Sequence, residues 1–139
     1  MATYNKHQQF VEDVAEKVHD LGSDTLTVAL TTNANAPVAT NSILSDLTEI
    51  SYTNLSSRAI TTTSSAHTTG TYKLTLTDLV LSASGAVATF RMVEIYNDTP
   101  ASPLNPLIGW YDHGSDVTLA SGETYTLDFD DANGFIQIA

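Results

Sequence analysis

The stretch LDFDDANGF, residues 127–135, combines three aspartates, an asparagine and a glycine, residue types that recur in calcium-binding loops. An EF-hand loop needs oxygen ligands at positions one, three and five, glycine at six and glutamate at twelve. Counted from Asp128, position five is Ala132, glycine arrives one residue late at Gly134, and the chain ends at Ala139 without a glutamate. The stretch instead predicts the turn of a hairpin between TYTLDF and FIQIA, because Asp, Asn and Gly accept left-handed backbone angles. The alternative is a weak, irregular cation site with the ligands Asp128, Asp130 and Asp131.

A second group of polar residues lies in GWYDHGSD, residues 109–116. The candidate metal ligands or acid–base residues are Asp112, His113 and Asp116, with His67 from elsewhere in the chain. A transition-metal site requires three or four converging ligands, whereas neighbouring residues of a strand point to opposite faces. Trp110 and Asp112 should therefore share one face, and Tyr111 and His113 the other. We expect a strand end followed by a Gly-Ser turn, and no metal site.

Other catalytic signatures are missing from the sequence, which has no G-x-S-x-G elbow, Walker loop, dinucleotide-binding glycine fingerprint or His-Glu-x-x-His motif. Paired carboxylates are unavoidable in so acidic a chain and do not indicate glycosidase chemistry; the examples are Glu94, Asp98, Glu123 and Asp128. Aromatic residues near the C-terminus either line a ligand slot or pack in the core; they are Trp110, Tyr111, Tyr125 and Phe129. We expect neither an enzyme nor a cofactor.

Charge and composition narrow the classes of partner. The 139 residues include 16 Asp and Glu against 5 Lys and Arg, for a formal net charge of −11. A phosphate-binding surface needs clustered Lys and Arg, and the few basic residues are scattered, so we expect no nucleic-acid partner and no attraction to an anionic membrane. There is no cysteine, which excludes disulfides and thiolate zinc sites. The sequence shows neither the apolar core of a signal peptide nor a run of about 20 apolar residues, so we expect a soluble protein made in the cytoplasm.

The N-terminal segment predicts one α-helix over about residues 5–21. Its apolar residues recur at helical spacing, and Gly22 follows where a left-handed cap residue belongs. The apolar stripe contains Phe10, Val11, Val14, Ala15, Val18 and Leu21. This stripe either packs over the rest of the domain or docks against another subunit.

The chain after Gly22 alternates apolar and polar residues in short runs separated by Gly, Pro, Asn and Asp. DTLTVALTT predicts a half-buried strand, FRMVEIY a central strand, and TYKLTLTDLVLSA a strand with a bulge at Thr77–Asp78. SILSDLTEI fits a short helical turn nearly as well as a strand, and residues 58–63 form either an edge strand or an exposed loop. The sequence therefore predicts a single, mainly β domain over residues 1–139. Its expected architecture is an antiparallel β-sandwich, jelly-roll or Ig-like, with the one N-terminal helix.

Several motifs, in order along nearly the whole chain, resemble a family of small structural proteins of tailed bacteriophages. They are SDTLTVALT, APVATNSILSDLTEI, FRMVEIYNDT, PLIGWYDHGSDVTLASGETYTLDFD and the closing NGFIQIA. One departure is SYTNLSSRAI, which stands where that family carries a glycine-rich stretch, so we expect this loop to be shorter or stiffer here.

The resemblance implies a virion component, most simply a capsid decoration or cement protein that binds the phage major capsid protein at the capsid surface. A neck or tail component (an adaptor, tail or fibre-associated protein) is the alternative. Such a cement protein is expected to be a homo-oligomer, with a trimer on a local threefold axis favoured. We expect contacts from the N-terminal segment and two Pro-containing loops, which are the longest stretches that the predicted core does not include. The expected interface residues are Ala2, Thr3, Tyr4, Asn5, Lys6, Asn35, Pro37, Pro100, Pro103 and Asn105.

A carbohydrate- or receptor-binding module is a third possibility. It requires aromatic residues exposed on one face, and the candidates are Tyr52, Tyr72 and Trp110.

Overall fold

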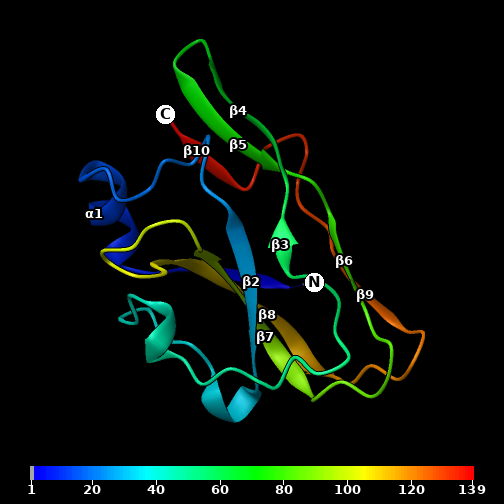
Figure 1. Cartoon of the computed structure of the whole chain (residues 1–139). Helices are drawn as coiled ribbons and strands as arrows, with labels where there is room; N and C mark the ends of the chain where they lie inside the picture. The colour runs from blue at the N-terminus through cyan, green and yellow to red at the C-terminus, as the bar shows by residue number, and fades with distance from the viewer. Residues whose placement is uncertain (1) are drawn as a thin grey trace.

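The computed structural model describes residues 2–139, which form three antiparallel sheets and one short helix (Figure 1). The largest sheet has five strands in the order β1-β8-β7-β2-β3, a second has the order β10-β5-β4, and β6 pairs with β9. The elements are β1 (Thr3–Lys6), α1 (Gln9–Ala15), β2 (Leu26–Thr31), β3 (Ala59–Ile60), β4 (Thr62–Thr68), β5 (Thr71–Leu76), β6 (Leu79–Ser82), β7 (Phe90–Asn97), β8 (Leu107–Val117), β9 (Thr124–Leu127) and β10 (Ile136–Ile138). Short 3-10 turns lie at Asn33–Asn35 and Leu44–Asp46. The mainly β prediction with one N-terminal helix is confirmed.

The main hydrophobic core unites all three sheets. In Figure 1 the five-stranded sheet passes through the centre, with β4, β5 and β10 above it and β6 and β9 beside it. The core takes fully buried residues from each sheet, among them Val28, Ile95, Leu76 and Leu81. Burying such side chains removes apolar surface from water, at about 25 cal/mol per Å². The alternating pattern of the sequence therefore identified the residues that hold the sheets together.

The second face of the five-stranded sheet is covered as well. All six residues of β2 are buried, although the alternation predicted a strand with one face in water. On the second face Ala29 packs with Tyr96 and Leu107 beneath the partly buried Leu44 and Leu47. The loop that contains the Leu44–Asp46 turn thus closes over the sheet, and the ambiguous SILSDLTEI segment is a helical turn rather than a strand.

The N-terminal helix is much shorter than predicted. Residues 3–6 are not helical, because they pair with β8 as the edge strand β1, with Tyr4 opposite Tyr111. Helix α1 ends at Ala15, and Lys17 takes a left-handed backbone (φ 69°), while the amide of Val18 donates to the carbonyl of Asp13 at 2.9 Å. The prediction of a helix over residues 5–21 capped at Gly22 is wrong, since pairing with β8 outweighs the helical pattern of the first residues.

The predicted hairpin between TYTLDF and FIQIA is also absent from the paired strands of residues 2–139. Strand β9 pairs with β6 and β10 pairs with β5, so residues 128–135 cross between two different sheets. The bulge predicted at Thr77–Asp78 is instead the point where the chain passes from one sheet to another. Strand β5 ends at Leu76, and β6 begins at Leu79 in the sheet that it forms with β9. The stretch around residues 58–63 contributes β3 and the start of β4, both of which are edge strands, as one of the two alternatives predicted.

No helix within residues 2–139 has the length and apolar character needed to span a membrane.

Candidate functional site

Two loops, residues 33–41 after β2 and residues 98–106 after β7, are joined where the first leads into residues 42–44 and the second into β8, and we call them together the loop end. Backbone hydrogen bonds tie it to the strands. The amide of Leu44 donates to the carbonyl of Asn105 at 2.9 Å, and the amide of Leu107 donates to Ser42 at 2.9 Å. The amide of Gln8, after β1, donates to the carbonyl of Ala39 at 2.9 Å. Backbone hydrogen bonds therefore join three segments that are far apart in the sequence, around residues 8, 39–44 and 105–107.

The loop end is also braced internally, yet it exposes apolar side chains. The Thr32 hydroxyl accepts a hydrogen bond from the amide of Asn35 at 3.3 Å, and the Asn41 side chain accepts one from the amide of Val38 at 2.8 Å. Val38 is nevertheless 54% exposed, and Leu104 in the other loop is 63% exposed. Val38 and Leu104 are therefore the apolar side chains that the loop end can offer to a partner.

The structure divides the predicted interface residues into two groups. Asn35, Pro100, Pro103 and Asn105 belong to the loop end, where each is exposed or partly exposed. Pro37 is buried, so it has no free surface to offer to a partner. Residues 3–6 form strand β1, which pairs with β8.

Strand β1 is part of the domain rather than a free arm, contrary to expectation. The ring of Tyr4 lies 5.1 Å from that of Tyr111 and 5.7 Å from that of Phe135, measured between centroids. The strands approach closely because residue 109 is glycine, and a Cβ there would lie 2.6 Å from the carbonyl oxygen of Asn5. Residues 3–6 therefore contribute to folding whatever contacts they make with a partner.

A buried ion pair lies on the second face of the sheet. His7 Nε2 is 2.8 Å from Glu94 Oε2, and both side chains are completely buried. Glu94 stands opposite Ala29 on β2 and Trp110 on β8, and the Trp110 ring lies 4.7 Å from the His7 ring. Within residues 2–139, His7 Nδ1 and Glu94 Oε1 have no hydrogen-bond partner. This pair joins β1 to the central strand.

Burial controls the ionisation of Glu94. Loss of hydration raises the pKa of its carboxyl to about 7, against the opposing effect of the hydrogen bond from His7. Two titratable groups in contact are typical of acid–base catalysis, but neither side chain reaches solvent, so a substrate has no access to them. One feature of the sequence could have indicated this pair: a glutamate lies between Val93 and Ile95 in an apolar central strand, where an unpaired charge would be costly.

The contribution of Glu94 to stability is expected to fall as the pH rises from about 5 to about 8. The pKa of Glu94 is raised to about 7 in the folded chain, from 4.5, so between these values the folded chain holds a proton that the unfolded chain has released. The resulting stabilisation is complete below the unfolded pKa and is lost as the pH rises through about 7. Urea titrations at both ends of this range measure it, with Glu94→Gln as the control that does not titrate. Equal pH dependence in the two proteins would contradict the assignment.

A second buried polar cluster connects the segment after α1 to the end of β7. The side-chain amide nitrogen of Asn97 is 3.0 Å from His19 Nδ1 and donates to Asp24 Oδ2 at 2.6 Å. Burial lowers the pKa of His19, with Asp13 and Asp24 opposing that shift. These contacts fix the ends of elements, and no motif in the sequence indicated them.

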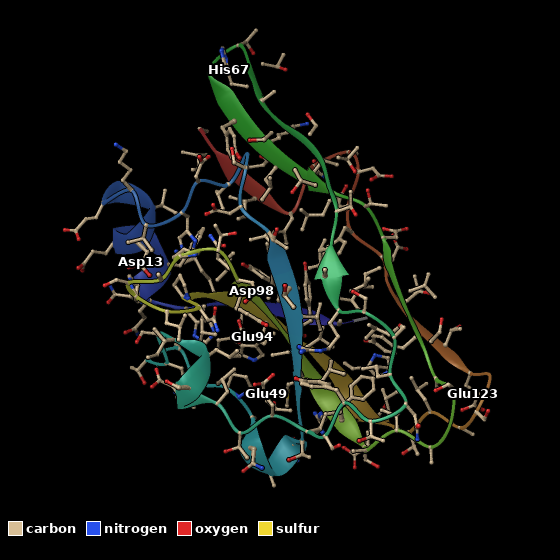
Figure 2. The ribbon with its side chains drawn as sticks, viewed as in Figure 1. Asp13, Glu49, His67, Glu94, Asp98 and Glu123 are labelled. Atoms are coloured by element: carbon tan, nitrogen blue, oxygen red, sulfur yellow. The ribbon has the colours of Figure 1, made fainter. Side chains whose placement is uncertain are left out.

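Trp110, Tyr111 and His113 alternate between the two faces as predicted, but the expected strand end and Gly-Ser turn are wrong, because β8 continues to Val117 with a shift of register after Asp112. Asp112 accepts two hydrogen bonds from Arg91, at 2.8 and 3.2 Å, and this bond holds the pKa of Asp112 below its ordinary value. His113 points to the other face, where its Nδ1 lies 3.2 Å from the Tyr125 hydroxyl. Figure 2 shows His67 at the tip of the β4–β5 hairpin. Residues 2–139 contain no group of three His, Asp or Glu side chains placed to hold a metal ion.

Figure 2 also separates the carboxylates noted in the sequence. Glu123 lies at an extremity of the molecule, well away from Glu94 in the interior. Asp98 begins the loop after β7, and Asp128 follows β9. The labelled acids therefore come from different parts of the fold, and the buried one is paired with His7.

The acidic stretch near the C-terminus forms a turn held by its own side chains. Asp130 Oδ1 accepts hydrogen bonds from the amides of Ala132 and Asn133, at 2.9 and 2.8 Å, and its other oxygen accepts from the Asn133 side chain at 2.8 Å. These bonds lower the pKa of Asp130, the Asn133 amide being the largest cause. The turn prediction is confirmed for this stretch. Both oxygens of Asp130 serve the turn.

A cavity of about 510 Å³ lies between β8 and the segment from β9 to Asp130. Of the four aromatic residues that the sequence offered as a ligand slot or as core, three line this cavity, namely Tyr111, Tyr125 and Phe129. Trp110 points to the opposite face of the sheet against His7 and is 9% exposed. The residues that complete the lining are Ala2, Val93, His113, Thr126, Leu127, Asp128 and Asp130.

The aromatic residues proposed for a carbohydrate face do not form one. Trp110 is buried, Tyr72 is partly buried with its hydroxyl 2.8 Å from that of Ser65, and Tyr52 is held by its own contacts. The Tyr52 hydroxyl donates to Glu49 at 2.5 Å and accepts the amide hydrogen of Leu30 at 2.9 Å, while the Arg58 guanidinium lies over its ring at 3.6 Å. Tyr52 thus attaches the segment that follows the Leu44–Asp46 turn to β2.

Comparison of this chain with protein-family models, with curated proteins and with solved structures finds no match.

Proposed function

We propose that this chain is a bacteriophage virion structural protein, a capsid decoration or cement protein that binds the major capsid protein and stabilises its lattice. The motifs of the sequence, taken in order along the chain, support the family. The loop end is the observation that carries the role, because its two hydrogen-bonded loops expose the apolar side chains of Val38 and Leu104 to solvent.

Attachment would depend on the area buried in each contact and on the number of simultaneous contacts, rather than on a reactive group. A stable contact buries on the order of 1,000 Å² or more, and simultaneous contacts with several subunits multiply weak affinities. We propose a homo-oligomer, a trimer on a local threefold axis, as the form that engages several capsid subunits at once. With a net charge of −11, the protein requires a partner surface that is neutral or basic where they touch.

We also propose that the sheets form a sandwich of the jelly-roll or Ig-like type. The shared core supports this, since the five-stranded sheet contributes Val28 and Ile95 to the same cluster as Leu76 and Leu81 from the other two sheets. A sandwich presents its loops beyond the ends of its strands, and the loops after β2 and β7 follow that pattern.

Particles assembled without this protein are expected to keep their geometry but to release DNA at a lower temperature, because only the avidity of the cement is removed. Adding the purified protein should restore resistance. The double variant Val38→Gln/Leu104→Gln should restore it poorly, since it removes the exposed apolar residues of the loop end. Val80→Gln is the matched control, because Val80 is 49% exposed but lies on β6. Thermal release of DNA from the particles measures each arm.

The same particles test the alternative. The copy number per virion follows from the gel band intensity of this protein relative to the major capsid protein. Hundreds of copies would agree with a decoration role. A dozen copies or fewer, with heads that form normally but never acquire tails, would replace decoration by a neck or tail role. Equal rescue by the double variant and by Val80→Gln would exclude the loop end as the contact surface.

A further inference from the structure

We propose that the cavity between β8 and β9 receives one cationic side chain, an arginine or a lysine, from the protein partner. The identity of the donor as a partner protein rests on the proposed structural role. The preference for a cation rests on the cavity alone, and the experiments below separate the two.

The aromatic walls of the cavity are fixed from behind by other rings. Tyr125 packs edge-on against Phe90, whose centroid is 5.3 Å away. Tyr111 packs against Tyr4 at 5.1 Å, and Phe129 packs against another phenylalanine at 5.8 Å. Burial of the two tyrosines raises the pKa of each hydroxyl, that of Tyr111 to about 12, so both rings stay neutral at physiological pH. The walls are therefore preorganised, and little side-chain freedom is lost when a ligand enters.

The charge of the lining selects a cation. Asp128 and Asp130 are the charged residues among the lining residues described, and neither a lysine nor an arginine is among them. Asp130 is kept ionised by the amides of its turn. Asp128 is exposed and makes no hydrogen bond within residues 2–139, so its carboxylate remains available. Arg91 pairs with Asp112 and does not line the cavity.

The shape of the lining selects an amphipathic cation. An arginine or lysine has an apolar stem and a charged head, and the cavity has an apolar wall of Leu127 and Phe129 beside the carboxylate of Asp128. Tyrosine rings attract a cation placed over their faces, by about 0.5–2 kcal/mol. The two ionised carboxylates of the lining, Asp128 and Asp130, can only accept hydrogen bonds, which suits the N–H groups of an arginine or a lysine.

The test is an NMR titration of the full chain with blocked amino acids. N-acetyl-arginine methylamide should shift the backbone amide signals of Tyr111, Tyr125 and Asp128 in a saturable way. N-acetyl-citrulline methylamide has the same shape without the charge and should not. Asp128→Asn should weaken binding about five-fold or more, which corresponds to the loss of one charge contact. Asp131→Asn is the matched control, since Asp131 is exposed in the same turn but does not line the cavity.

Equal binding of the citrulline derivative, or stronger binding of methyl glucoside or methyl galactoside, would overturn the cation preference. So would the absence of any saturable shift. The partner is tested separately on the particles described above. If wild-type protein rescues them and Asp128→Asn rescues equally well, the cavity does not receive the partner, although the proposed function stands. If blocked arginine binds but wild-type protein rescues nothing, the cation preference survives and the proposed function fails.

Discussion

Replacing Glu94 by alanine is expected to lower the free energy of unfolding by about 3–5 kcal/mol, because removal of one partner leaves the other uncompensated inside the protein. His7 would lose its 2.8 Å contact while remaining completely buried against the Trp110 ring. The truncation would also leave a void at the buried site of the Glu94 side chain, which lowers the free energy of unfolding further. Urea denaturation of both proteins at about neutral pH measures the difference.

Two further variants identify the cause of that loss. Glu12→Ala removes a glutamate from the exposed side of α1 and should change stability by about 0.5 kcal/mol or less. The double variant His7→Leu/Glu94→Leu replaces the pair by apolar side chains and should recover much of the loss, since such replacements are often neutral. A loss for Glu94→Ala as small as that for Glu12→Ala would show that the pair does not stabilise the fold.

Replacing Gly134 by valine is expected to destabilise the protein by about 2–4 kcal/mol, for two reasons that add. The backbone of Gly134 is left-handed (φ +77°), a conformation that a β-branched residue adopts at a cost. In addition, a Cβ at this position would lie 2.8 Å from the carbonyl oxygen of Leu74. That oxygen accepts the amide hydrogen of Phe135 at 2.7 Å, so it has little room to move.

Gly122→Val separates these two reasons. Gly122 has a similar backbone (φ +86°), but no atom lies within 4 Å of a Cβ built there. It should therefore show the backbone cost alone, about 1–2 kcal/mol. Asp131→Ala, in the same turn as Gly134, should cost less than either. Thermal or urea unfolding compares the three, and equal losses at the two glycines would mean that contact with Leu74 contributes nothing.

The local structure of the C-terminal stretch followed from sequence, whereas its pairing did not. Asp130, Asn133 and Gly134 form a turn because their side chains and backbone angles suit one, and this requires only near neighbours. The partner of each flanking strand is a long-range choice. Strand β9 joined β6 and β10 joined β5, so a turn that fits a hairpin serves a crossing between sheets.

The cavity and the predicted interface show the same division. Strand alternation placed Tyr111 and His113 on one face and Trp110 on the other, as the structure has them. The sequence left two roles open for the aromatic residues, a ligand slot or core packing, and the structure contains both. Tyr111 lines the cavity under the segment after β9, whereas Trp110 packs against His7 on the opposite face. The N-terminal residues were expected to be free, but their pairing with residues 109–112 makes them an edge strand.

Local sequence patterns predicted the β-rich class and the positions of most strands and turns. These depend on backbone angles and on a repeat of two residues, both of which are local. The tertiary structure alone decided the short helix, the strand order, the loop end and the contact of His7 with Glu94. Each of these joins residues far apart in the chain, 87 positions in the case of that pair. Local propensities are worth about 1 kcal/mol or less per residue, so long-range pairing and burial override them.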